Sequence, residues 1–333
     1  MADVSLNSHS PHTPDSVRPA PAASSVFVRR IGKFLAAEVT NVDLRKPLDP
    51  QTVEEIRLAH SEHGVLVFPD QKISSEDLKR FGRYFGKLTV HPFSTNDKEQ
   101  PELIVYDNKE GNPPPQTDVW HSDETFRECP PMGTALCSKV IPAIGGDTVF
   151  CSMEAAYEGL PDRIQKLIEG MEAIHDFVSF KGLFPNTPEG QRRLKDYELK
   201  FPPMVHPVVR VHPVTGRKSL FVNPGKFTIA IKGMSDPESR WLLDLLGRTV
   251  NTLEYHYRHR WVPDMVVFWD NRSLQHAAVH DYYPQQRKMD RITIEGDRPF
   301  GTGAKATESE IRRRKVPSVL DFKDRPKREF ERG

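Results

Sequence analysis

The chain has 333 residues, of which 28% are charged, and its formal net charge at pH 7 is +1. A nearly neutral chain has no global field that would favour nucleic acid or an anionic membrane, so any anion must be recognised locally. The three cysteines, Cys129, Cys137 and Cys151, form neither a CxxC pair nor a secreted disulfide pattern, and no apolar run approaches the roughly 18 residues of a membrane span. We therefore expect a cytoplasmic protein that binds neither nucleic acid nor membrane.

Both ends of the chain differ in composition from the middle. Residues 1–25 are rich in Ser, Pro, Ala and His and contain almost nothing that could form a core, which predicts a disordered leader. Residues 302–333 mix Lys and Arg with Asp and Glu, which is typical of a charged, solvated tail. Between them we expect one domain over residues 26–301, because β-rich units often exceed 200 residues.

The first clear elements are a strand and a helix. Residues 65–68 form an apolar run between Gly64 and Pro69, which predicts a buried strand. Ser74 to Asp77 resembles a capping box, and Leu78, Phe81 and Phe85 follow at helical spacing.

A second helix is predicted after Ser235, again from a capping box, which ends at Glu238. Its expected apolar stripe comprises Trp241, Leu242, Leu245 and Leu246. Most other apolar segments are short and rich in β-formers: residues 103–106, 208–211, 265–269 and 292–294. No internal repeat and no glycine-rich nucleotide loop is present. The pattern predicts an α+β fold whose core is dominated by strands.

A candidate metal site lies in two distant segments. His121 and Asp123 are two residues apart, so both reach one side of the chain if residues 120–126 are extended. The third ligand is His276 or His280; we favour His276, because it follows a buried apolar run and a turn, whereas His280 fits a structural role. Two imidazoles and one carboxylate can occupy one face of an octahedral Fe(II) and leave three positions open.

Two arginines follow this site. If residues 287–294 form a strand, Arg287 and Arg291 share one face. Buried guanidinium groups need anionic partners, and their planar fork suits carboxylate or sulfonate oxygens. Internal salt bridges to Asp or Glu remain the alternative explanation.

Over residues 26–300 the sequence resembles the TauD/TfdA family of Fe(II)- and 2-oxoglutarate-dependent dioxygenases. This resemblance implies a double-stranded β-helix (jelly-roll) core with flanking helices. It rests on several blocks in register: Trp120 to Phe126, Gly145 to Thr148, His206 to Pro213, Trp269 to His276, and Arg287 to Asp297.

The resemblance also implies roles for single residues. His121, Asp123 and His276 match the iron ligands, and Thr148 and Arg287 match the pair that holds the distal carboxylate of 2-oxoglutarate. Together with O2 as cosubstrate, such a site hydroxylates a substrate C–H bond and releases succinate and CO2.

The implied substrate is a small organic anion. Arg291 and His91 match residues that bind the sulfonate in taurine-oxidising members of the family. Glu124 and Thr117 replace other residues at that pocket, and a carboxylate at Glu124 would oppose a second anion unless it turns away or meets a cation. We therefore expect a sulfonate, sulfate ester or carboxylate other than taurine, and a hydroxylated product that can fragment.

Other functions remain open. The same three ligands could hold Zn(II) in a hydrolase, but Thr148 and Arg287 would then have no purpose. A non-catalytic ligand-binding descendant, or an aryloxyalkanoate or amino-acid oxygenase, is also considered. The family resemblance suggests a homodimer or homotetramer.

Overall fold

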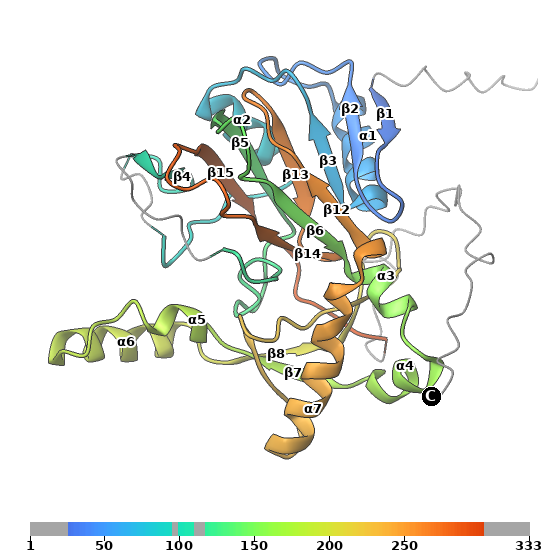
Figure 1. Ribbon diagram of the computed structural model, residues 1–333, viewed down its shortest axis with the longest axis vertical. Coiled ribbons are helices and arrows are strands. Elements are labelled where there is room, and N and C mark those ends of the chain that lie inside the picture. The colour runs from blue at the N-terminus through green and yellow to red at the C-terminus, as the bar shows by residue number, and fades with distance from the viewer. Residues whose placement is uncertain (1–25, 95–98, 110–116, 303–333) are drawn as a thin grey trace, which may run out of the picture.

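The computed structural model describes residues 26–94, 99–109 and 117–302. The predicted leader and, apart from Thr302, the predicted tail lie outside these residues. The largest sheet has seven strands in the order β1-β2-β3-β13-β5-β15-β4, and every neighbouring pair is antiparallel except β2 and β3 (Figure 1). Its strands are β1 (Phe27–Arg30), β2 (Ala37–Thr40), β3 (Val65–Phe68), β4 (Ile104–Asp107), β5 (Gly133–Val140), β13 (Val266–Asp270) and β15 (Lys288–Ile294).

A second, three-stranded sheet packs on one face of the large one. Its order is β12-β6-β14, with β6 (Thr148–Ser152), β12 (His256–His259) and β14 (Leu274–Ala278). Phe150 and Leu274 from this sheet join Val67, Val267 and Trp269 of the large sheet in one buried cluster. Apolar side chains from facing sheets therefore form the central core, as strand alternation requires.

Two helices cover the other face of the large sheet. They are α1 (Pro50–His63), which is capped by Asp49, and α2 (Ser75–Arg83), which begins with the predicted capping box at Ser74. Ile56, Leu78 and Phe81 of these helices pack with Leu66 and Phe68 of β3 in a second cluster. Since β3 is covered on both faces, all four of its residues are buried, which confirms the strand predicted at 65–68.

The remaining elements lie beyond the small sheet. They are two sheets, β11-β7-β8 and β10-β9, and several helices (Figure 1). The strands are β7 (Glu172–His175), β8 (Met204–Pro207), β9 (Val209–Val211), β10 (Lys218–Leu220) and β11 (Thr228–Ile231). The helices are α3 (Met153–Glu158), α4 (Asp162–Ile168), α5 (Val178–Lys181), α6 (Pro188–Lys200), α7 (Asp236–Gly247), η2 (Arg248–Asn251) and η3 (Leu253–Tyr255). Among the described residues, no helix is long and apolar enough to cross a membrane.

The predicted apolar stripe of α7 is only partly correct. The helix and its capping box at Ser235 are present, but Trp241 is 57% exposed, while Leu242, Leu243 and Leu246 are buried. The helix therefore presents a face that is rotated from the predicted one. The extended chain over residues 120–126, which was one way for His121 and Asp123 to face the same ion, is not present: His121 forms a single bridge with His276, and a turn begins at Asp123.

Candidate active site

The three candidate metal ligands come together through strand pairing. His121 and His276 exchange backbone hydrogen bonds, with His121 N donating to His276 O at 3.1 Å and the reverse bond at 2.8 Å. This bridge extends the edge of β14 and places both imidazoles side by side, with ring centroids 4.4 Å apart. The turn that follows carries Asp123 back toward them, and Glu124 adopts a positive φ of 47° in it. A turn, and not an extended strand, therefore brings Asp123 close to the two histidines.

The donor atoms of this group lie close together. His121 Nε2 and His276 Nε2 are 3.7 and 3.8 Å from Asp123 Oδ1, and one potential ligand atom from each residue lies within 4.8 Å of the others. Burial lowers the pKa of His276 to about 3 and also lowers the pKa of His121. Burial acts to raise the pKa of Asp123, but Arg291 and the two histidines outweigh it and hold that pKa below its usual range. Neutral imidazoles and an ionised carboxylate are the forms that bind a metal ion.

Neighbouring polar groups fix the orientation of these side chains. His121 Nδ1 lies 2.7 Å from Val119 O, which places a proton on Nδ1 and leaves the Nε2 lone pair available. Thr134 Oγ1 donates to Asp123 Oδ2 at 2.6 Å, and Asn271 Nδ2 donates to Thr134 at 3.0 Å. Asn271 Oδ1 also accepts from the backbone N–H of Asp123 at 3.3 Å. Sequence reasoning did not identify Thr134 or Asn271: Asn271 contacts residues more than 100 positions away, and no local motif marks Thr134 as a partner of Asp123.

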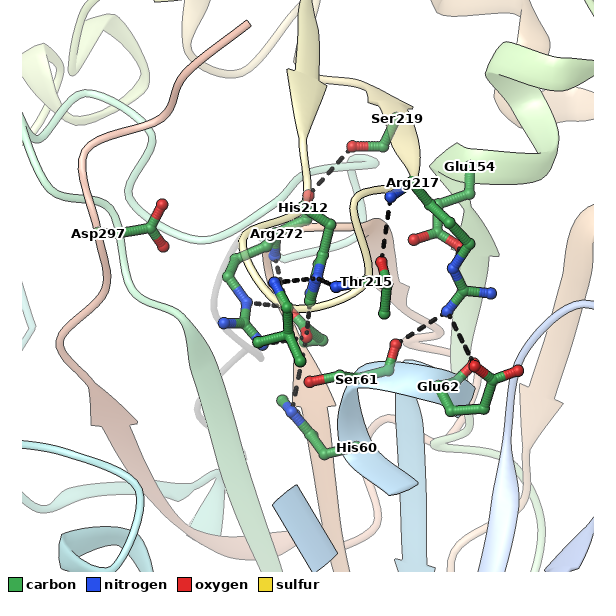
Figure 2. Close-up of polar contacts among 12 residues, drawn as sticks. His60, Ser61, Glu62, Glu154, His212, Thr215, Arg217, Ser219, Arg272 and Asp297 are labelled. Atoms are coloured by element: carbon green, nitrogen blue, oxygen red, sulfur yellow. Dashed lines mark hydrogen bonds and ion pairs between the residues drawn. The ribbon is translucent and has the colours of Figure 1, made fainter. Parts of the chain in front are cut away.

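A buried polar network holds the turn that carries Asn271. Asp270, at the end of β13, is fully buried and accepts hydrogen bonds from Arg272 Nε at 2.8 Å and from His212 Nε2 at 3.0 Å. His60 Nδ1 of α1 lies 3.5 Å from the same carboxylate. Figure 2 shows His60, His212 and Arg272 converging from three different segments. The network fixes the position from which Asn271 reaches Asp123.

Thr148 and Arg287 lie together at another part of the site. Trp261 Nε1 donates to Thr148 Oγ1 at 3.0 Å, and the Arg287 guanidinium carbon lies 5.8 Å from the centroids of the Trp261 and Tyr282 rings. Arg287 Nε donates to Gly146 O at 3.1 Å. Gly146 has a φ of 75°, and a Cβ there would lie 3.1 Å from Arg287 Cδ, so the close approach favours glycine. Arg287 forms no ion pair with a carboxylate among the residues that the structure describes.

Arg291 lies beside the three candidate metal ligands. Its Nη2 is 2.8 Å from Asp123 Oδ1, and its Nη1 donates to the Tyr106 hydroxyl at 2.8 Å. The internal salt bridge that we considered for the two arginines is therefore present for Arg291 alone, and its partner is a candidate metal ligand.

The remaining candidates have identifiable partners. The Glu124 carboxylate accepts a hydrogen bond from Arg127 Nε at 2.7 Å. This cation partly offsets the charge of Glu124, so the carboxylate opposes an anionic substrate less than an unpaired one would. His91 Nδ1 accepts from Phe93 N at 3.2 Å. Thr117 Oγ1 is 3.3 Å from His280 Nε2, and His280 is not one of the three candidate metal ligands whose donor atoms converge.

All nine residues proposed from the sequence line one cavity of about 480 Å³. They are His91, Thr117, His121, Asp123, Glu124, Thr148, His276, Arg287 and Arg291. The cavity lies between the two facing sheets, with Leu136, Trp269 and Arg291 from the large sheet and Thr148 and His276 from the small one. Lys226 and Phe180 also line the cavity. They were not identified from the sequence, because no motif near either residue indicates that its turn or helix forms a wall of the cavity.

Comparisons with known proteins identify the same family that the sequence resembles. The family model "Taurine catabolism dioxygenase TauD, TfdA family" matches residues 26–293. An alpha-ketoglutarate-dependent sulfate ester dioxygenase of Pseudomonas putida is 35% identical over 85% of this chain and 93% of its own length. An alkylsulfatase of Acinetobacter baylyi is 34% identical over 81% of this chain and 85% of its own length.

The solved structures agree as well. A crystal structure of a putative alpha-ketoglutarate-dependent taurine dioxygenase from Burkholderia xenovorans superposes with a TM-score of 0.71 at 31% identity, covering 84% of this chain and 95% of that one. This likeness confirms the predicted jelly-roll core with flanking helices. The chain belongs to the TauD/TfdA family and is a 2-oxoglutarate-dependent dioxygenase.

Proposed function

We propose that His121, Asp123 and His276 hold Fe(II) in this enzyme. The observation that carries the proposal is the convergence of all nine sequence-derived residues on one cavity, with these three donor groups adjacent. Two neutral imidazoles and one carboxylate suit Fe(II) and leave positions for other ligands. When bound, Fe(II) together with O2 and 2-oxoglutarate supplies the oxidising power for hydroxylation of a C–H bond, with succinate and CO2 as co-products.

Thr148 and Arg287 would hold the distal carboxylate of 2-oxoglutarate. Arg287 is nearly buried, and its guanidinium carbon lies 5.8 Å from the centroid of each of two aromatic rings, which limit its movement. The Thr148 oxygen accepts a hydrogen bond from Trp261, so its own hydrogen can be donated to a ligand. A fixed guanidinium and a hydroxyl donor are suited to one carboxylate.

The substrate would be a small organic anion with an apolar body. Arg291 and His91 would bind its anionic group, and Thr117 and Glu124 would contribute polar wall near it. Phe93, Phe180, Leu183 and Phe227 line the same cavity and would contact the apolar part. We favour a sulfate ester, as the names of two relatives suggest, or a sulfonate, over an aryloxyalkanoate or another carboxylate.

The product of such a reaction can fragment. A hydroxyl group added to the carbon that bears a sulfate ester oxygen gives a carbon with two oxygen substituents. Its C–O bond to sulfate then breaks as the hydroxyl loses its proton, which yields an aldehyde and sulfate. Trapping an aldehyde together with stoichiometric succinate would identify this outcome.

The test is an anaerobic titration of the purified protein with Fe(II), with and without 2-oxoglutarate. We expect a visible charge-transfer band for the wild type that is absent from His121→Ala. Arg291→Ala should keep the band and weaken binding of sulfate esters and sulfonates. No band from the folded wild type would refute the ligand assignment. Metal-dependent hydrolysis that needs no 2-oxoglutarate would favour the Zn(II) hydrolase, and anion binding without turnover would favour a binding protein.

Three further properties belong to the same proposal. Residues 26–301 would form a single catalytic domain, which limited proteolysis can test. The enzyme would assemble as a dimer or tetramer, which light scattering can measure. It would work in the cytoplasm, since its three cysteines form no disulfide and a reducing compartment suits them; cell fractionation can test this.

A further inference from the structure

A chain of hydrogen bonds ends on one oxygen of the Asp123 carboxylate. Thr134 lies on β5, between β13 and β15 of the large sheet, and its Oγ1 donates to Asp123 Oδ2 at 2.6 Å. Asn271 follows the end of β13, and its Nδ2 donates to Thr134 Oγ1 at 3.0 Å. The backbone N–H of Asn271 donates to Met132 O at 3.0 Å, which fixes the start of the chain. Thr134, Asn271 and Asp123 are each at most 3% exposed, so these hydrogen bonds are shielded from water.

The direction of each hydrogen bond follows from donors that cannot accept. Asn271 Oδ1 accepts from Trp269 Nε1 at 3.1 Å and from the backbone N–H of Asp123 at 3.3 Å. An indole N–H and a backbone N–H only donate, so this end of the Asn271 amide is its oxygen and the other end is its NH2 group. The NH2 group donates to Thr134, and the Thr134 hydroxyl hydrogen is therefore directed at Asp123 Oδ2.

The other carboxylate oxygen of Asp123 faces the two histidines. Oδ1 lies 3.7 Å from His121 Nε2 and 3.8 Å from His276 Nε2. Arg291 Nη2 is 2.8 Å from the same oxygen, but a carboxylate oxygen has two lone pairs and can bind a metal ion while it contacts a guanidinium. The two oxygens of Asp123 therefore differ: Oδ1 lies beside the other candidate ligands, and Oδ2 is bonded to a hydroxyl of the core.

This difference determines how many coordination positions Asp123 would occupy. Two imidazoles and one carboxylate oxygen fill three positions of an octahedral Fe(II) and leave three open. In the proposed reaction, 2-oxoglutarate needs two of them, for its keto and adjacent carboxylate oxygens, and O2 needs the third. If Asp123 bound through both oxygens, only two positions would be open, and a cosubstrate would have to displace Oδ2.

We propose that Thr134 and Asn271 are positioning residues that restrict Asp123 to metal binding through Oδ1 alone. Thr134 retains Oδ2 in a hydrogen bond, and Asn271 fixes both the direction of the Thr134 hydroxyl and the backbone at Asp123. Together they keep open the positions that the two cosubstrates need. This inference rests on the proposed function, because it assumes that His121, Asp123 and His276 hold Fe(II).

The test uses variants that each change one bond of the chain. Thr134→Val keeps the shape and removes the hydroxyl, and Thr134→Ser keeps the hydroxyl. Asn271→Asp keeps the accepting oxygen but replaces the NH2 group by a second acceptor, which would take the Thr134 hydrogen from Asp123. Thr293→Val is the matched control, because Thr293 is buried opposite Thr134 on β15 and its Oγ1 has no hydrogen-bond partner among the described residues.

Two measurements on the full chain report the binding mode without turnover. A crystal structure of the protein loaded with Mn(II) shows which oxygens of Asp123 contact the metal, and calorimetry of the same protein gives its affinity for 2-oxoglutarate. We expect contact through Oδ1 alone in the wild type and through both oxygens in Thr134→Val. The visible band of the anaerobic complex with Fe(II) and 2-oxoglutarate checks that the cosubstrate binds the metal.

The affinity of Thr134→Val for 2-oxoglutarate should fall about tenfold or more, because the cosubstrate must displace Oδ2 once the hydrogen bond to this ionised group is lost. Asn271→Asp should lose affinity in the same direction. Thr134→Ser should restore most of the affinity, and Thr293→Val should bind 2-oxoglutarate as the wild type does. Thermal melts verify that each variant is folded.

Several results would overturn the inference. Contact of both oxygens with Mn(II) in the wild type would do so even if no variant folded. Unchanged affinity in folded Thr134→Val, an equal loss in Thr293→Val, or a loss that serine does not restore would exclude the Thr134 hydroxyl. Wild-type affinity in Asn271→Asp would exclude Asn271. Failure of the proposed function is distinguishable, because the wild type would then bind neither Mn(II) nor Fe(II) at the three ligands.

Discussion

Replacing Thr148 by valine should impair 2-oxoglutarate binding and protein stability through two separable causes. The Thr148 hydroxyl accepts a hydrogen bond from Trp261 Nε1 at 3.0 Å, and we propose that it donates to the cosubstrate. Valine has nearly the same shape and removes both interactions. The indole N–H of Trp261, which is 3% exposed, would then be buried without its acceptor.

The size of each effect follows from the type of hydrogen bond lost. A hydrogen bond to a charged group contributes about 1.5–3 kcal/mol, which corresponds to a rise of about 10- to 150-fold in the KM for 2-oxoglutarate. A buried N–H left without a partner costs about 1–3 kcal/mol of folding free energy, which corresponds to a fall in Tm of roughly 2–12 °C for a domain of this size.

The assays are succinate release at varied 2-oxoglutarate and thermal unfolding of the apoprotein. Thr148→Ser keeps the hydroxyl and is the matched control for both. Trp261→Phe combined with Thr148→Val removes the orphaned N–H, so stability should recover in part while the KM stays high. An unchanged KM in Thr148→Val would remove Thr148 from the cosubstrate site, and an unchanged Tm would mean that Trp261 finds another acceptor.

Three other variants test separate features. Arg287→Ala should raise the 2-oxoglutarate concentration needed for half-maximal turnover by at least about 10-fold, because a charge-assisted contact is lost; an unchanged requirement would refute its role. Asp270→Asn should destabilise the fold by about 3–5 kcal/mol in urea unfolding, since Arg272 would keep a buried charge without its carboxylate, and a change below about 1 kcal/mol would contradict this. Burial raises the pKa of Glu154 from 4.5 to about 7, so between these two values the folded state retains a proton that the unfolded state loses. The free energy of unfolding should therefore fall by roughly 3 kcal/mol as the pH rises from 4.5 to 7. Glu154→Gln should reduce this dependence of stability on pH.

Local sequence patterns predicted elements well where a single physical cause dominates. The capping box at Ser74 and the apolar run at 65–68 each specify a short segment by themselves, and both elements are present. The stripe of α7 was misplaced because its apolar residues cover a wide arc of the helix. Tertiary packing selected Leu243 and left Trp241 in solvent, and helical spacing alone cannot make that choice.

The candidate site could be located from the sequence because its chemistry is concentrated in short motifs. The motifs do not contain the residues that position it. Asn271 reaches Asp123 from a turn that is distant in sequence, and Thr134 reaches it from β5. Lys226 lines the cavity because Asn223 binds the turn of Lys226 to the 121–125 segment. Such residues become visible only when the register between segments is known.

The backbone bridge between His121 and His276 explains why these distant motifs form one site. β14 pairs with β6 in a register that places His276 opposite Phe150 and Ala278 opposite Thr148. The same strand then accepts His121 on its other edge. Two proposed iron ligands and the proposed cosubstrate threonine are thus positioned by one strand, β14. A one-residue slip of β14 would turn His276 away from the cavity and shift it relative to Thr148 and His121 at once. The register of this strand therefore matters as much to the site as the identities of the three ligands.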